Sequence, residues 1–103
     1  MLLATTDTLN AEDEVLGMVK GSRVRARHLG HDIVAALRKL VGGEISEYAQ
    51  LLEETREEAI QAMIAEARKL GADAVIGVRM MSNSITAGAA EMVVYGTAVR
   101  FKR

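Results

Sequence analysis

Cysteine and proline are absent from the 103 residues, and only three residues are aromatic. Without cysteine, a disulfide framework and a thiolate metal site are both excluded. The aromatic residues Tyr48, Tyr95 and Phe101 are too few and too scattered to form a stacking platform for nucleic acid. A formal net charge of −1 also argues against general binding of polyanions, so we expect no nucleic-acid partner.

Long hydrophobic runs are absent as well. The uncharged stretches are too short, or too rich in serine and glycine, to span a bilayer. The first seven residues do not show the basic segment and apolar run of a signal peptide. We therefore expect a cytoplasmic protein without a membrane partner.

The clearest positive signal is an amphipathic helix over residues 44–70. Its apolar or small side chains recur at spacings of three and four and form one stripe, made of Ile45, Tyr48, Leu52, Thr55, Ala59, Met63, Ala67 and Leu70. Gly71 follows at once, and a glycine tolerates the positive φ with which a helix commonly ends.

The remaining segments predict a single α+β domain over residues 1–103, with an antiparallel sheet and two helices packed on it in two layers. Apolar runs and alternation predict strands over residues 2–6, 14–27, 74–81 and 91–101. A first helix is expected over residues 29–41, and residues 82–90 are expected to be flexible. The order along the chain is thus β-β-α-α-β-β.

The second of these strands changes its pattern midway. Val15, Gly17, Val19 and Gly21 share one face if the strand is regular, and they leave a shallow surface for close packing. Beyond a bend or bulge at Gly21, arginines at alternate positions predict a basic outer face, with Val24 and Ala26 buried behind it.

The lengths of these elements predict an oligomer. A helix over residues 44–70 spans roughly 40 Å, whereas a compact domain of this size has a radius of gyration near ~13 Å. A strand over residues 91–101 adds about 36 Å. Either the elements bend or partner subunits cover them, and we favour partner subunits.

Several segments together resemble the YbjQ family, and the resemblance covers nearly the whole chain. These segments are residues 5–9, 17–21, 41–44 with Tyr48, 70–77 and 95–99. The resemblance implies a dodecin-like subunit in a ring, usually a pentamer, and a family label of heavy-metal binding. It implies no settled activity.

One candidate metal site contains His28, His31 and Asp32. Spacings of three and four residues place these side chains on one side of a helix, where they could hold a divalent metal ion as a cofactor. Without a thiolate, the donors do not favour a soft heavy metal. In the alternative interpretation, His28 and Asp32 cap the first helix and His31 is solvated.

A second candidate site is the row formed by Arg23, Arg25 and Arg27, which could hold a carboxylate or phosphate ligand. Alternatively, these arginines are solvated, or they form salt bridges between subunits with the glutamate-rich side of the long helix. That side carries Glu53, Glu54, Glu57 and Glu58.

These features favour a non-enzymatic homo-oligomer that binds a metal ion or small anion at subunit junctions. The rival hypothesis is an enzyme with a shared inter-subunit site, in which His28 acts as acid or base beside Arg25 or Arg27. Neither a phosphate-binding glycine loop nor a nucleophile elbow is present in the sequence.

Overall fold

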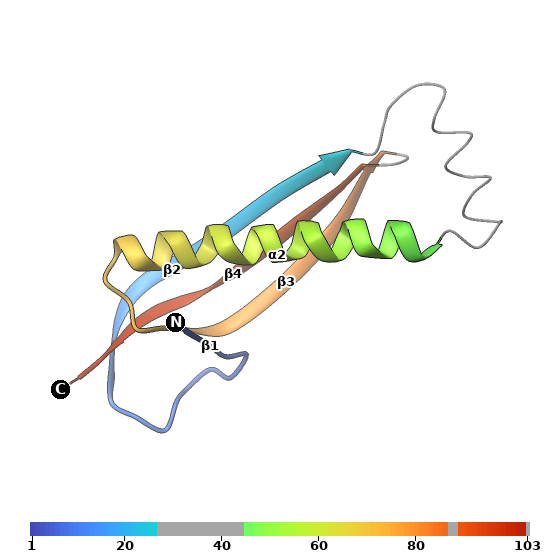
Figure 1. Cartoon of the computed structure of the whole chain (residues 1–103). Helices are drawn as coiled ribbons and strands as arrows, with labels where there is room; N and C mark the ends of the chain where they lie inside the picture. Colours follow the sequence, from blue (N-terminus) through green and yellow to red (C-terminus); the bar gives the residue numbers. More distant parts are fainter. Residues whose placement is uncertain (27–44, 87–88, 103) are drawn as a thin grey trace.

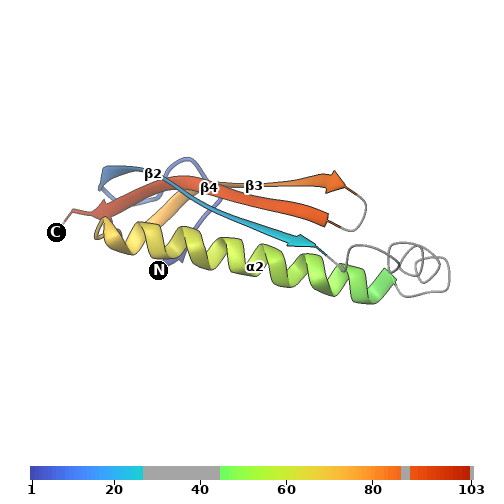
Figure 2. The ribbon, with the colours of Figure 1, turned by 90° about the horizontal axis from the view of Figure 1, so that it is seen from above.

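The computed structural model describes residues 1–26, 45–86 and 89–102, and it has two layers. One layer is a four-stranded sheet in the order β1-β3-β4-β2, and the other is the helix α2 (Figures 1 and 2). The elements along the chain are β1 (Leu2–Leu3), β2 (Asp13–Ala26), α2 (Ile45–Lys69), β3 (Ala74–Thr86) and β4 (Ala89–Phe101).

The α+β class and most element positions agree with the sequence prediction, but the sheet is mixed rather than wholly antiparallel. β1 runs parallel to β3, whereas β4 is antiparallel to both β3 and β2. The chain passes through β2 and α2 between β1 and β3, so it can return in the direction that parallel pairing needs. The helix expected over residues 29–41 lies outside the described residues.

The hairpin of β3 and β4 is longer than predicted. Residues 82–86 and 89–90, which were expected to be flexible, extend the ladder, with Ser82 opposite Met92 and Thr86 opposite Ala89. β1 is shorter than the predicted strand. Even so, backbone bonds continue beyond it, from the Gly77 amide to the Thr6 carbonyl (2.7 Å) and from Val78 to Ala4 (3.0 Å).

The main core lies between α2 and the sheet, and it confirms the central part of the predicted stripe. Thr55, Ala59, Met63 and Ala67 are fully buried on α2. Three of them, Ala59, Met63 and Ala67, form one cluster with buried sheet residues. These sheet residues are Val19, Val75, Val78, Met92, Val94 and Ala98. Leu70 lies beyond the end of the helix and is 45% exposed, so its assignment to the buried stripe was wrong.

Gly21 is the point of closest approach between β2 and α2. A Cβ atom there would overlap the Ala59 carbonyl oxygen and come within 2.6 Å of the Met63 nitrogen. The expected close packing is therefore confirmed at this position. No irregularity of register occurs at Gly21 itself, since it pairs with Val94 in an unbroken ladder.

The bulge predicted at Gly21 lies instead between Val15 and Gly17. Leu16 is the extra residue, and Gly17 adopts φ +139°, a conformation that favours glycine. Because a bulge changes the alternation of faces, Val15 does not share a face with Val19. Val15 is 64% exposed, whereas Val19 is buried under α2.

The predicted faces of the second half of β2 are reversed. Arg23 is paired with the buried Met92 and therefore lies on the α2 side, while Val24 lies on the other face and is 56% exposed. The reason is that the strand stays regular through Gly21, so Arg23 shares its face with Val19.

The end of α2 confirms the role expected of Gly71. Its φ is +78°, and its amide donates to the Arg68 carbonyl (3.0 Å) while the Ala72 amide donates to the Ala67 carbonyl (3.1 Å). This pair of bonds is a Schellman motif, which satisfies carbonyls that the helix leaves free and turns the chain into β3.

A smaller cluster lies on the sheet face away from α2. Residues 4–12, here called the N-terminal loop, cover that face near the ends of the strands (Figure 2). The cluster comprises Ala74, Ile76 and Val99 with Ala4, Leu9 and Phe101. Arg79 holds the loop in place, because its Nη1 donates to the Thr5 carbonyl (2.8 Å) and its Nη2 lies 3.5 Å from Asp7 Oδ1.

The molecule is elongated, as the element lengths predicted. Its principal extents are 56 × 21 × 16 Å and its radius of gyration is 17.1 Å, against about 13 Å for a compact domain of this length. α2 does not meet the requirements for a membrane-crossing helix, and it is the only helix in the described segments. The cytoplasmic location stays a prediction.

Candidate binding groove beside β2

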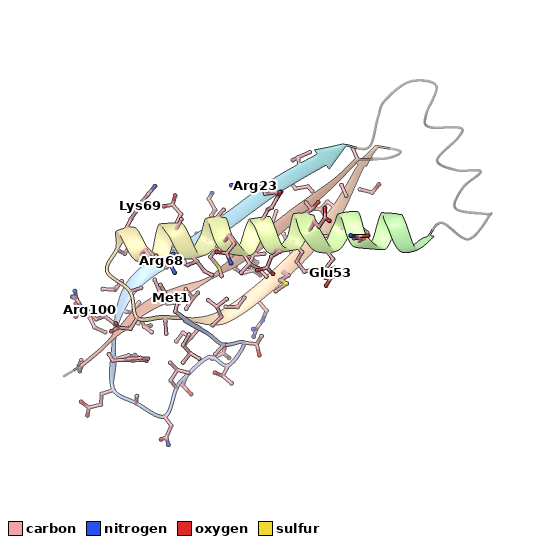
Figure 3. The ribbon with its side chains drawn as sticks, viewed as in Figure 1. Met1, Arg23, Glu53, Arg68, Lys69 and Arg100 are labelled. Atoms are coloured by element: carbon pink, nitrogen blue, oxygen red, sulfur yellow. The ribbon has the colours of Figure 1, made fainter. Side chains whose placement is uncertain are left out.

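An open groove of about 680 Å³ lies between Arg23 on β2 and the exposed side of α2. Arg23 reaches it because the regular β2 strand directs this side chain toward the helix. Figure 3 shows Arg23 and Glu53 on opposite sides of α2. The helical residues that line the groove are Glu54, Glu57, Glu58, Gln61, Ala62 and Ala65.

The groove combines one guanidinium with three carboxylates. Gln61 Nε2 donates to Glu57 Oε1 (3.3 Å), and Gln50 Nε2 donates to Glu54 Oε1 (3.5 Å). These bonds, formed between residues one turn apart, offset part of the repulsion among the glutamates. Arg23 Nη1 donates to the Ser22 carbonyl (2.8 Å), which directs the guanidinium along the edge of β2.

This environment is acidic as well as basic, and the expected pairing of the arginines with these glutamates between subunits stays a prediction. The carboxylates make the groove attractive to a cation or to a basic side chain, and they disfavour a second anion. Of the other predicted anion ligands, Arg25 lies in β2 opposite Ala90, while its side chain is not described. Arg27 lies outside the described residues, so the three-arginine site stays a prediction.

The predicted metal ligands His28, His31 and Asp32 also lie outside the described residues. Among the residues that are described, no group of three or more His, Cys, Asp or Glu side chains could hold a metal ion. Met63 and Met92 are buried in the main core, where their thioethers fill space between α2 and the sheet. The rival enzyme hypothesis depends on His28 and therefore stays a prediction too.

A second open groove, of about 820 Å³, follows the outer edge of β2 toward the end of α2. β2 is the last strand in the sheet order, so within the described residues its outer edge pairs with no strand. Apolar side chains flank this edge, and Met18 is 73% exposed. The groove is lined by residues 18–23 together with Ala62, Glu66, Lys69, Leu70 and Val93.

The Arg79 anchor was missed in the sequence analysis. Its bond to Thr5 joins positions 74 residues apart, and no local pattern of charge or hydrophobicity reports such a contact. The only available signal was the polar run at residues 5–8, which lies beside a short apolar strand.

Comparison with known proteins identifies the family. Residues 1–102 match the YbjQ family, whose description is "Putative heavy-metal-binding". A "UPF0145 protein" from Methanosarcina acetivorans is 52% identical over 102 residues, which cover 97% of this chain and 96% of that protein. A "UPF0145 protein" from Archaeoglobus fulgidus is 50% identical over 104 residues, with 99% and 96% covered.

A solved structure supports the fold. The crystal structure of a protein of unknown function from Pediococcus pentosaceus, assigned to the DUF74 family, has a TM-score of 0.76. It covers 99% of this chain and 98% of its own, and at 17% sequence identity the likeness concerns the fold alone. The sequence match extends from the first β-strand to the last, and the chain belongs to the YbjQ family.

Proposed function

We propose that this protein is a non-enzymatic binding module that assembles from five copies of the chain into a ring. The observation that carries the proposal is the outer edge of β2, which pairs with no other strand of the described segments and is flanked by exposed apolar side chains and an open groove. Such edges invite pairing with another chain, and proteins normally cover or block them.

A second open edge supports a ring rather than a simple pair. Residues 2–6 cover only the beginning of β3, so from Arg79 to Thr86 this strand is bonded only to β4 within the described part of the chain. The two open edges lie on opposite sides of the subunit. Joining one edge to the other in head-to-tail contacts gives a heterologous assembly, which closes into a ring if the rotation permits. The number five comes from the resemblance to the family.

The ligand that we propose is a divalent metal ion or a small anion bound at the junction. The family description supports a metal. The ligands that we propose for this metal are His28, His31 and Asp32, which follow β2 in the sequence and have imidazole nitrogen and carboxylate oxygen atoms. Imidazole and carboxylate donors suit a borderline ion such as Zn²⁺ better than a soft ion, which prefers thiolates.

Native mass spectrometry tests assembly and binding together. The full chain is purified without a histidine tag and without added metal, and is then measured alone and with Zn²⁺. We expect a pentamer that carries additional metal mass, which His28→Ala with His31→Ala removes while Lys102→Ala retains it. A monomer at micromolar concentration would refute the ring. A metal-free pentamer in the presence of Zn²⁺ would refute the metal site and leave assembly as the function.

A further inference from the structure

The sheet face away from α2, here called the outer face, is only partly covered. Three rows of directly paired residues from β2, β4 and β3, here called rungs, cross its open part. The basic rung is Lys20–Tyr95–Arg79, the middle rung is Ser22–Val93–Met81, and the acidic rung is Val24–Glu91–Asn83. All nine side chains share the outer face, since directly paired residues point to the same side of a sheet.

The open part of the outer face has definite ends. On one side, the N-terminal loop packs on Ala74, Ile76 and Val99. On the other side, the hairpin ends close to Ala89. The open stretch of β4 on this face therefore runs from about Thr97 to Glu91, because Ala89 is only 6% exposed, and it includes Val93.

This open part exposes apolar side chains that water does not favour. Met18 is 73% exposed, Val24 is 56% exposed and Met81 is 48% exposed, and all three lie on the outer face by their pairing partners. Three exposed apolar side chains on one sheet face, bordered by polar groups, favour a contact with another molecule.

Charges are distributed unequally about the middle rung. Within the described residues Lys20 has no ion-pair partner, and the Arg79 guanidinium is turned toward the N-terminal loop. On the opposite side of the rung, Glu91 accepts a long bond from Asn83 Nδ2 (3.4 Å) and has no ion-pair partner among the described side chains. One side of the open stretch is thus positive and the other negative.

We propose that the outer face binds the outer face of a second copy of this chain, related by a two-fold axis that runs across the strands at the middle rung. Such an axis places the basic rung of each copy over the acidic rung of the other. Lys20 then reaches the partner's Glu91, because a lysine stem can span the roughly 4.8 Å between neighbouring strands. The Ala89 end of β4 in each copy then lies next to the other copy's N-terminal loop.

The alternatives fit the observations less well. An axis along the strands would place Lys20 over the partner's Arg79 and bring the two N-terminal loops together. The exposed side of α2 is also a poor partner, because its described side chains include Glu53, Glu54, Glu57 and Arg68 and give it a mainly acidic surface. Another outer face supplies both apolar side chains and the complementary charge.

The contact is small, and it shares Met18, Lys20 and Val93 with the groove along β2. Three strands about 4.8 Å apart and seven residues of about 3.4 Å give a face roughly 10–15 Å wide and 24 Å long. This is below the roughly 800 Å² that each partner buries in a stable complex. We therefore expect a concentration-dependent pair of chains, detected as an increase in mass above that of the ring or monomer at low concentration.

Single-cysteine cross-linking tests the axis directly, because the natural chain contains no cysteine. In the proposed pair, the two copies of Val93 face each other across sheets about 10 Å apart, whereas the two copies of Met18 lie roughly 27 Å apart. We expect Val93→Cys to be cross-linked to a dimer by a short bis-maleimide, and Met18→Cys to stay unlinked. No dimer from Val93→Cys, or equal linking of both variants, would overturn the proposal.

Charge exchange provides the second test, with sedimentation velocity as the readout over a range of concentrations. Lys20→Glu and Glu91→Lys should each weaken pairing at least roughly tenfold, because like charges then face one another. The double variant should restore pairing, and the control Arg56→Glu, at an exposed position of α2 outside both grooves, should leave it unchanged. If the double variant pairs no better than the single variants, the two-fold contact is refuted, whereas a change in ring size would bear on the proposed ring instead.

Discussion

Replacing Gly21 with alanine should destabilise the protein more than any other single methyl group added to β2. The new Cβ atom would overlap the Ala59 carbonyl oxygen and lie within 2.6 Å of the Met63 nitrogen. Both obstacles are backbone atoms of a regular helix, so they cannot rotate away as a side chain can. Relief requires β2 and α2 to separate along their contact.

The magnitude follows from the cost of overpacking, which is typically 1–3 kcal/mol. Because backbone meets backbone at Gly21, we expect about 3 kcal/mol. The whole stability of a chain of this length is of the order of 5–15 kcal/mol. With a urea m value of about 1.5 kcal/mol/M, the unfolding midpoint should fall by about 2 M.

Urea unfolding followed by circular dichroism measures this loss, at a fixed protein concentration because assembly would also contribute stability. Ser22→Ala is the matched control, since Ser22 is the next residue, exposed on the outer face. Its effect should stay within about 0.5 kcal/mol. A Gly21→Ala variant as stable as Ser22→Ala would show that α2 does not approach β2 this closely.

Three further substitutions test other parts of the fold. Ala59→Glu should cost about 3 kcal/mol or more by burying an unpaired charge, measured by urea unfolding; an unchanged midpoint would contradict the assigned helix face. Gly71→Ala should cost about 1 kcal/mol, and Gly71→Val more, because φ is +78°; neutral variants would place the helix end elsewhere. Arg100→Ala should lower the melting temperature by less than about 4 °C, since its 3.1 Å pair with Glu14 is half exposed. A larger drop would indicate a structural role for that pair.

The features that the sequence predicted well are local. A stripe with spacings of three and four residues identified α2 and its buried side, and Gly71 marked its end because few other residues adopt a positive φ. The ladder beyond Met81 was missed because residues 82–86 show no apolar alternation. Their pairing depends on β4, whose own pattern was clear.

The errors in β2 have one physical cause. A single extra residue at Leu16 changes which side chains face α2, and composition does not distinguish a bulge at Gly17 from one at Gly21. Assuming a break at Gly21 placed Arg23 on the outer face. The glutamates were expected to pair with arginines of another subunit, which stays a prediction; within one subunit, Arg23 and three of these glutamates line the same groove.

The position of β4 has a consequence for the order of folding. β4 is the last strand along the chain, yet it is the central strand, bonded to β2 on one side and to β3 on the other. Until it is present, β2 and β3 have no common partner, and most strand contacts join residues distant in sequence. Such topologies fold slowly and expose unpaired strands in the meantime. α2 can form early from local interactions. Its apolar side then stays exposed to water until the sheet assembles, which requires residues from 89 onward to have been synthesised.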